Sequence, residues 1–344
     1  MKALLPRRFI LFFLLFWTLW VFYRWLATQA NKRQSCSLRM DSNISILLWH
    51  WPFGHQFELD GDVCWERYGI PRCHLHNQRS QFYYADVVVF HHNELKNGTQ
   101  KLPLDLCRPP EQKWLWLSLE SPASNGILYA YNGLFNWTMS YRRDADIFMP
   151  YGELVPKKTT KEYIIPKNKS FLACWVVSNY VTQHRRSKVY ESLKKLIKVQ
   201  VYGNWAKRPL TVKELLPTIS RCYFYLAFEN SEFKDYITEK LWRNSFQAGA
   251  VPVVLGPPRK NYELLVPPNS FIHVDDFESL DSLVDFLKQL ASNETQYRSY
   301  FKWQEHYEVK VYADWRERLC KICTLYQKPL NKKVYHNLHA WANR

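Results

Sequence analysis

The 344-residue sequence lacks the motifs by which common nucleic-acid-binding proteins are identified. It contains no helix-turn-helix spacing, zinc-finger pattern or RNP-type motif, and no internal repeat or low-complexity segment. A hydrophobic content of 47% and an aromatic content of 17% exclude a disordered chain. Lys and Arg exceed Asp and Glu by 47 to 31, a net charge of +16. This excess fits anionic partners such as a nucleotide diphosphate, sialylated glycans or a membrane surface, or simply a basic surface.

The sequence also has no hydrophobic run that reaches the ~20 residues of a full membrane crossing. Near the N-terminus, Phe9–Tyr23 is an apolar stretch of fifteen residues without a charge, and Trp25–Ala27 extends it beyond Arg24, whose side chain can reach the interface. Positive charge before this stretch predicts that the N-terminus stays cytoplasmic. The residues that carry this charge are Lys2, Arg7 and Arg8.

We therefore predict a cytoplasmic tail over residues 1–8, a signal-anchor helix over 9–27 and a stem over 28–43, with the rest luminal. A signal peptide cleaved near Thr28–Ala30 is the alternative, and the bulky core without an Ala-x-Ala pattern disfavours it. Sequons for N-glycosylation agree with a luminal location. They are Asn43, Asn97, Asn136, Asn168 and Asn293.

The eight cysteines are an even number, compatible with disulfides in a secretory compartment. Cys320 and Cys323 form a C-x-x-C pattern, but they lack the thioredoxin-like βαβ context of a redox site. Zinc would need a second Cys or His pair, and Cys64 and Cys73 have the wrong spacing. Structural bridges are therefore predicted, and local pairs 64–73 and 320–323 remain open. Cys36 and Cys107 have no partner that the sequence identifies.

From Ile44 onwards, short apolar strands alternate with helical or irregular stretches, which predicts an α/β fold with parallel sheets buried on both faces. A Lys- and Pro-rich linker near 156–168 divides the chain into domains over 44–165 and 170–310, followed by a tail over 311–344. Strands are predicted at 44–49, 87–91, 114–119, 147–149, 171–177, 199–202, 223–228, 251–255 and 271–274. Helices are predicted at 183–197, 238–248, 280–290 and 295–310.

The segment Tyr223–Gly256 is the most informative part of the sequence. An apolar strand ends there in Glu229, Asn230 and Ser231, a polar loop and a helix start follow, and Val251–Leu255 reads as the next buried strand. Open parallel sheets bind ligands at the carboxyl ends of their strands, and helix N-termini favour anions. This segment therefore predicts a cradle for nucleotide phosphates.

In the same segment, FENS, DYITEK and AGAVPVVLG resemble the donor-binding motif of the α1,3/4-fucosyltransferases of glycosyltransferase family 10, which use GDP-fucose. The resemblance covers Ile44–Tyr326. It implies a GT-B fold, in which two doubly wound Rossmann-like domains face a cleft, behind a signal anchor in the Golgi membrane. GDP-fucose is then a co-substrate, and neither a cofactor nor a metal is required. The tail over 311–344 is expected to pack on the N-terminal domain.

The motifs WHWPF, RYGIPRCHL and VVFHHNEL look most like the leukocyte-type members of that family. These members add fucose to the GlcNAc of α2,3-sialylated N-acetyllactosamine on glycoproteins or glycolipids, which makes sialyl Lewis x. The alternatives are a broader enzyme that uses neutral lactosamine and, from another class, an inactive glycan-binding homologue. A metal-dependent GT-A transferase would have to use Asp144 and Asp146, a D-x-D pair whose arginine neighbours favour a structural ion-pair cluster.

An inverting transfer needs a general base and groups that stabilise the departing diphosphate. The resemblance assigns Glu120, in LESP, as the base, and Arg186 and Lys240 as the groups on the diphosphate, although Arg185 is adjacent to Arg186. A turn after the first strand, at His55 or Gln56, is expected to contact the acceptor. Further donor contacts implied by the resemblance are Tyr151, Val176, Ser178, Asn179, Tyr225, Asn230, Tyr236 and Glu239. It also implies the bridges Cys64–Cys320, Cys73–Cys323 and Cys174–Cys222.

Overall fold

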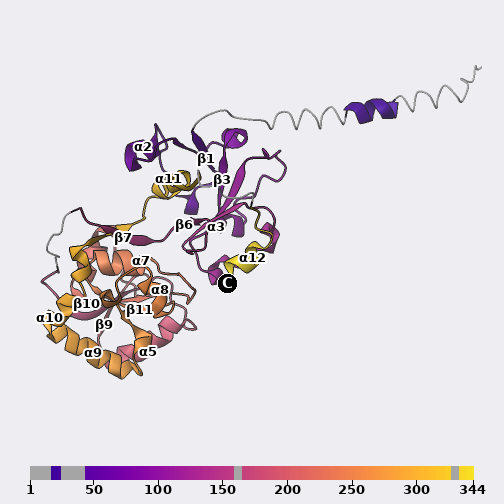
Figure 1. Ribbon diagram of the computed structural model, residues 1–344. Coiled ribbons are helices and arrows are strands. Elements are labelled where there is room, and N and C mark those ends of the chain that lie inside the picture. Colours follow the sequence, from indigo (N-terminus) through magenta and orange to yellow (C-terminus); the bar gives the residue numbers. More distant parts are fainter. Residues whose placement is uncertain (1–16, 25–42, 159–164, 327–332) are drawn as a thin grey trace, which may run out of the picture. The chain divides into compact units, whose positions relative to one another are not determined.

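The computed structural model describes residues 17–24, 43–158, 165–326 and 333–344 (Figure 1). The predicted cytoplasmic tail, the stem up to residue 42, most of the predicted anchor and part of the linker lie outside these ranges. Within them, no helix has both the length and the apolar character needed to cross a membrane. Contacts divide the chain into two units. Unit 1 comprises Met1–Leu115 and Leu319–Asn331, and unit 2 comprises Trp116–Arg318 and Lys332–Arg344.

Unit 1 is built around β1 (Ile44–Leu48), which pairs in parallel with both β2 (Cys73–His76) and β3 (Val87–His91). Every residue of β1 and β3 is buried, as expected for parallel strands covered on both faces. Sequence reasoning missed β2, whose four residues CHLH offer only a short alternation. Residues 17–24 are helical. The helical elements between β1 and β4 are η1 (Pro52–Gly54), α2 (Val63–Tyr68), η2 (Arg79–Tyr84) and α3 (His92–Lys96).

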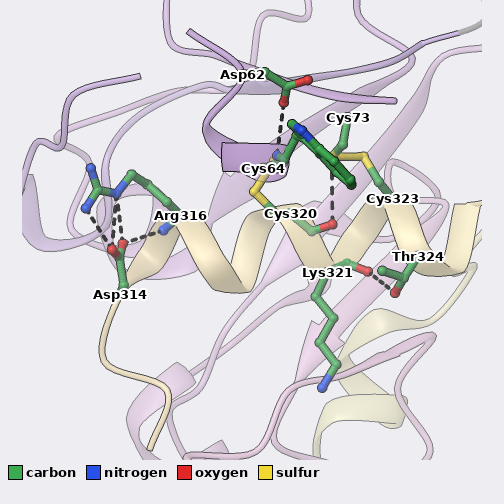
Figure 2. Close-up of a disulfide and its surroundings, with 10 residues drawn as sticks. Asp62, Cys64, Cys73, Asp314, Arg316, Cys320, Lys321, Cys323 and Thr324 are labelled. Carbon is green, nitrogen blue, oxygen red and sulfur yellow. Dashed lines mark hydrogen bonds and ion pairs between the residues drawn. A yellow bond between two sulfur atoms is a disulfide. The ribbon is translucent and has the colours of Figure 1, made fainter. Parts of the chain in front are cut away.

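Two disulfides join the N-terminal part of unit 1 to helix α11 (Trp315–Tyr326) (Figure 2). Cys64 of α2 is bonded to Cys320, and Cys73 of β2 to Cys323, across 256 and 250 residues of sequence. These are the pairings that the family resemblance implies. They also account for the close approach of the sulfur atoms of Cys64, Cys73 and Cys320, which would otherwise suggest a metal site. Cys107 is disulfide-bonded as well.

The strand order of the six-stranded sheet is β2-β1-β3-β4-β5-β6, and the boundary between the units falls within β4 (Lys113–Leu117). In unit 2, β5 (Trp137–Ser140) pairs in parallel with β6 (Ile147–Phe148). Short helices α4 (Pro122–Asn125) and η3 (Tyr129–Tyr131) connect β4 to β5. The strand β5 was not predicted, because its four residues WTMS are too few to show a clear alternation of apolar and polar side chains.

A second, five-stranded sheet in unit 2 is entirely parallel, with strand order β12-β11-β10-β8-β9. From β8, the chain adds β9 on one side of the sheet and then β10, β11 and β12 on the other side. The direction in which strands are added therefore changes between β8 and β10. Cys174 of β8 is bonded to Cys222 of β10, the third implied bridge. The strands are β8 (Phe171–Val176), β9 (Val199–Tyr202), β10 (Cys222–Phe228), β11 (Val251–Leu255) and β12 (Ile272–His273).

Both faces of this sheet are covered, because neighbouring residues of its central strands β8, β10 and β11 enter separate hydrophobic clusters. Phe224 and Leu226 of β10 belong to one cluster, and Tyr225 and Ala227 belong to the other. The first cluster includes side chains of α5 (Arg185–Leu196), α9 (Leu280–Ser292) and α10 (Glu294–Ser299). The second includes side chains of α6 (Val212–Ser220), α7 (Glu239–Leu241), η4 (Trp242–Gln247) and α8 (Arg259–Glu263). The sheet is therefore doubly wound.

The prediction of a helix over 295–310 was wrong. The helix α10 ends at Ser299, the short η7 (Lys302–Glu305) follows, and β13 (Tyr307–Val311) then pairs antiparallel with β7 (Gly152–Pro156). The residues YEVKV alternate polar and apolar side chains, which is the pattern of a strand, and they pair with β7. The helix predicted over 238–248 is α7 followed by the π-helix η4, and the chain ends in α12 (Leu338–Ala342).

Candidate active site

The carboxyl ends of β8 and β10 define the candidate donor site of unit 2, since they flank the point where the strand order reverses. Ligands of open parallel sheets bind at such a switch point. Ser178 and Asn179 follow β8 and are exposed, and Val176 ends that strand. Glu229 and Asn230 follow β10 directly. The donor residues predicted after β8 and those predicted after β10 therefore lie at the ends of two neighbouring strands.

Glu229 organises the loop that follows β10, although sequence reasoning gave it no role in the site. Its buried carboxylate accepts hydrogen bonds from the backbone N–H of Thr238 at 2.8 Å and from the Thr238 hydroxyl at 2.9 Å. It also forms an ion pair with the Lys240 ammonium, with 2.9 Å between Oε2 and Nζ. Burial raises the pKa of Glu229, and the charge of Lys240 opposes that rise. Glu229 thus fixes both Thr238 and Lys240.

The ammonium of Lys240 has two further acceptors, the Thr238 hydroxyl at 2.7 Å and the Glu239 carboxylate at 3.3 Å. Burial acts to lower the pKa of Lys240, but the charges of Glu229 and Glu239 outweigh it and raise the pKa. The lysine is therefore cationic at neutral pH, and its side chain is still 12% exposed. A cation that is held in place and partly accessible suits a diphosphate.

Arg186 is a second buried cation at this site, in the first turn of α5. Its Nη2 donates to the backbone carbonyl of Asn179, and its Nε is buried without a hydrogen-bond partner among the described residues. Burial lowers the pKa of Arg186, while the charge of Glu229 acts to raise it. The adjacent Arg185 is half-exposed and pairs with two surface carboxylates instead, those of Glu232 and Asp275. The geometry thus distinguishes the two arginines.

Three other predicted donor residues belong to β10 or to the loop that follows it. Tyr225 is fully buried, and its hydroxyl accepts a hydrogen bond from Asn244 Nδ2 at 3.0 Å. The Oδ1 atom of Asn230 is buried and has no hydrogen-bond partner among the described residues. Tyr236 is buried and packs against Tyr141, with 4.9 Å between ring centroids. The unsatisfied atoms of Asn230 and Arg186 are polar groups that a bound ligand would satisfy.

Asp235 shapes the loop that carries Tyr236. Its backbone adopts a left-handed conformation, with φ of 65°, which is unusual for a residue other than glycine. The carboxylate accepts hydrogen bonds from Arg143 Nε at 3.2 Å, from the Arg143 backbone N–H at 3.2 Å and from Asn261 Nδ2 at 2.9 Å. These contacts hold the strained residue in place, as is common beside functional sites.

Glu120, the predicted base, lies three residues after β4 and belongs to the same unit as the donor cluster. Ser121 donates a hydrogen bond to Ser231 at 3.0 Å, and the hydroxyl of Tyr151 donates to the carbonyl of Leu119 at 2.7 Å. Burial raises the pKa of Tyr151 well above its usual value, and the charge of Glu120 adds to the rise. The segment 119–121 is thus anchored to the loop after β10.

Both carboxylates of the D-x-D pair contact other protein groups, one of which is a neighbouring arginine. Asp144 pairs with Arg142, with 2.8 Å between Oδ2 and Nη2. Asp146 accepts hydrogen bonds from the Thr138 backbone N–H at 2.9 Å and from the hydroxyl of Tyr335 at 2.7 Å, and it pairs with Lys333. Both carboxylates are therefore engaged by protein groups.

A separate cavity of about 690 Å³ in unit 1 contains one of the two acceptor candidates. Gln56 lines this cavity, whereas His55 is not among its lining residues. Trp49, Trp51 and Phe53 supply aromatic surface, which suits the apolar face of a sugar. The other lining residues are Leu48, His50, Gly54, Asn77, Arg79, Asn93, Glu94, Asn97, Thr99 and Gln100.

The predicted glycosylation sites differ in accessibility. Asn97, Asn168 and Asn293 are exposed, whereas Asn43 and Asn136 are half-buried. Asn136 donates from Nδ2 to the carbonyl of Lys333 at 3.0 Å. The three exposed asparagines are therefore the better candidates for glycan attachment.

Comparison with known proteins identifies the family. Residues 41–152 match the model "Fucosyltransferase, N-terminal", and residues 166–341 match "Glycosyltransferase family 10 (fucosyltransferase) C-term". The chain is 45% identical to alpha-(1,3)-fucosyltransferase 7 of Mus musculus over 95% of this chain and 81% of that protein. It is 47% identical to the Homo sapiens protein of the same name over 87% and 86% of the two chains.

A second group of relatives is also named as fucosyltransferases, and a solved fucosyltransferase structure has a similar fold. The chain is 43% identical to 4-galactosyl-N-acetylglucosaminide 3-alpha-L-fucosyltransferase 9 of Bos taurus over 86% of this chain and 81% of that protein. The crystal structure of an α1,3-fucosyltransferase with GDP-fucose shares the fold, with a TM-score of 0.55 at 19% identity over 89% and 97% of the two chains. The chain therefore belongs to glycosyltransferase family 10 and is an α1,3-fucosyltransferase.

Proposed function

We propose that this enzyme transfers fucose from GDP-β-L-fucose to O3 of GlcNAc in α2,3-sialylated N-acetyllactosamine, with inversion at the anomeric carbon. The observation that carries this proposal is the Ser121–Ser231 hydrogen bond, because it ties the segment of Glu120 to the loop that leads to Lys240. The name of one relative includes a galactosyl-N-acetylglucosaminide acceptor, which supports lactosamine as the acceptor class. The sialylated form is supported by the motifs WHWPF, RYGIPRCHL and VVFHHNEL, which resemble the leukocyte-type members of the family.

Donor binding in this proposal uses both strand ends of the five-stranded sheet. The diphosphate lies between Arg186, which binds in the forked geometry of a guanidinium, and Lys240, which acts as a point charge. Both cations neutralise the charge that develops on the leaving group. Glu239 accepts from hydroxyl groups of the ribose or fucose. The remaining contacts come from Tyr151, Val176, Ser178, Asn179, Tyr225, Asn230 and Tyr236.

Glu120 is the general base. Its carboxylate takes the proton of the acceptor hydroxyl as that oxygen bonds to the anomeric carbon, and the bond from this carbon to the GDP oxygen breaks. The electron pair of the broken bond remains on the diphosphate, where Arg186 and Lys240 stabilise it. Because the reaction needs only one carboxylate and two cations, we propose that no metal is required. The engagement of Asp144 and Asp146 by protein groups supports this.

The wider organisation of the chain is part of the proposal. We infer a GT-B arrangement, with an acceptor-side domain over 44–165 and a donor-side domain over 170–310. We also infer a Golgi location, in which a signal anchor over 9–27 holds a luminal catalytic part in a type II orientation. The fifteen-residue uncharged stretch and the basic residues before it support the anchor.

The test is a transfer assay with purified luminal protein and GDP-fucose. Sialylated and neutral lactosamine are offered at matched concentrations, and NMR identifies the linkage and anomeric configuration of the product. We expect an α1,3-linked product and faster transfer to the sialylated acceptor. Equal rates on both acceptors would refute the sialylated subtype. No transfer to either acceptor would refute the proposed activity, and a retained β-configuration would refute inversion.

A further inference from the structure

The cavity of unit 1 is lined by an arginine, Arg79, whose guanidinium stacks on an aromatic ring. Arg79 begins η2 and is exposed, and among the described residues that line the cavity it is the only Lys or Arg. Its guanidinium carbon lies 4.5 Å from the ring centroid of Trp49, and its Nη2 donates to the Gln100 side-chain carbonyl at 2.5 Å. An arginine that rests on an aromatic ring loses less freedom when it binds an anion.

Trp49, beneath this arginine, is itself fixed. Its indole N–H donates to the carbonyl of Lys101 at 3.0 Å, and its ring packs against Phe82 and Phe90 at 5.8 and 5.9 Å between centroids. The guanidinium therefore rests on a rigid, buried platform rather than on a mobile surface.

On the same cavity, Phe53 is held in a strained conformation. Its φ is 54°, in the left-handed region, and the residue is 49% exposed. The backbone N–H of Phe53 donates to the buried carboxylate of Glu94 at 2.7 Å. An exposed aromatic ring whose backbone strain is maintained by a buried group is typical of a binding element.

Glu94 does not compete with Arg79 as a charge in the cavity. Its second oxygen lies 2.6 Å from His91 Nδ1, and Asn93 Nδ2 donates to the first oxygen at 3.1 Å. Burial acts to raise the pKa of Glu94, but the hydrogen bond with His91 and those from Asn93 and Phe53 outweigh it and lower the pKa to about 2. Both oxygens of this carboxylate are engaged by protein groups, which leaves the Arg79 guanidinium to receive an anion.

We propose that this cavity is the subsite for the sialic acid of the acceptor, in which Arg79 binds the sialate carboxylate and Phe53 packs against a sugar ring. The proposal rests on the proposed function and deepens it, since it names the residue that would make the enzyme prefer a sialylated acceptor. A guanidinium binds a carboxylate with two parallel hydrogen bonds. The cavity volume of about 690 Å³ is in the range of ligand sites.

The test compares sialyl-lactosamine with its methyl ester, which keeps the sugar and removes the negative charge. Variants R79Q and R79K are measured beside R67Q, in which an exposed arginine of α2 outside the cavity is changed. For R79Q we expect kcat/KM on the acid to fall about 10- to 100-fold, mainly through KM. The ester should change less than about twofold, and R79K should recover part of the loss. R67Q should match the wild type on both acceptors.

Three outcomes would overturn the proposal. They are equal use of acid and ester by the wild type, an R79Q variant that still prefers the acid, and an R79Q variant that loses both acceptors equally while its melting temperature matches the wild type. A wild type that transfers fucose to neither acceptor would refute the proposed activity instead. The subsite is then tested by saturation-transfer NMR, in which the acid must bind the wild type and not R79Q.

Discussion

The hydroxyl of Ser121 lies 3.0 Å from the hydroxyl of Ser231, 110 residues further along the chain. The first serine follows Glu120, and the second follows Asn230. This contact connects two loops. One follows β4 and carries the proposed base, and the other follows β10, begins at Glu229 and leads to Lys240. In the proposed mechanism, proton removal and departure of the diphosphate must occur in one displacement, and a shared anchor keeps the two groups in register.

The buried ion pair between Glu229 and Lys240 predicts a large effect on stability. We expect E229Q to lower the free energy of unfolding by about 2–4 kcal/mol, because the buried ammonium loses its closest charged partner. Urea unfolding followed by fluorescence measures this. The control is E278Q, at an exposed carboxylate, for which less than ~0.5 kcal/mol is expected. Equal stability of E229Q and the wild type would show that Glu229 does not hold Lys240.

The different settings of Arg185 and Arg186 predict different effects on donor affinity. Titration calorimetry with GDP should give a Kd raised about 10- to 100-fold for R186Q, because this guanidinium is buried at the strand ends and its Nε has no hydrogen-bond partner in the described part of the chain. R185Q is the matched control. It breaks exposed ion pairs only, so its Kd should stay within about threefold of the wild-type value. A larger loss for R185Q than for R186Q would reverse the assignment.

The carboxylate of Glu94 predicts a pH-dependent contribution to stability. Its pKa is lowered to about 2 in the folded chain, so the native state favours the ionised form. The contribution is complete above the unfolded pKa of ~4.5 and is lost as the pH falls towards 2. Wild type should therefore exceed E94Q in unfolding free energy at pH 7, and this difference should shrink from pH 5 to pH 3. A difference that stays constant with pH would contradict this account.

The engagement of Asp146 by Thr138, Tyr335 and Lys333 predicts a structural rather than a metal-binding role. We expect D146N to lower the melting temperature while kcat for fucose transfer stays within about threefold of the wild type, because the side chain is removed from a hydrogen-bond cluster and not from the reaction. EDTA should leave the transfer rate unchanged. Loss of transfer in EDTA that added Mn²⁺ restores would instead support a metal-dependent reaction.

Several strands of both units could be predicted because they are short and mostly apolar. Val87–His91, Val199–Tyr202 and Val251–Leu255 form strands with the predicted bounds, and β8 and β10 differ by one residue at one end. Where the sequence pattern was weak, long-range pairing decided the structure. The antiparallel pair β7 and β13 is the clearest example, since neither segment reveals its partner locally.

Of the candidate site, the sequence revealed the strand-end residues but not what holds them. Glu229 stood at the end of a buried strand, a signal that could have marked it, yet its contact with Lys240 depends on how the loop folds back. The Ser121–Ser231 hydrogen bond and the contacts of Asp235 with Arg143 and Asn261 join distant segments through side chains. No spacing in the sequence encodes such contacts, because they arise from tertiary packing.

The central claim is that Glu120 is the base in a transfer whose donor is held by Arg186 and Lys240. The most direct test measures fucose transfer and GDP-fucose affinity for E120Q and wild type in parallel. We predict that E120Q binds GDP-fucose with a Kd within about twofold of the wild-type value and transfers fucose about 10²- to 10⁴-fold more slowly. Transfer by E120Q at a rate within a few-fold of the wild-type rate would contradict the account.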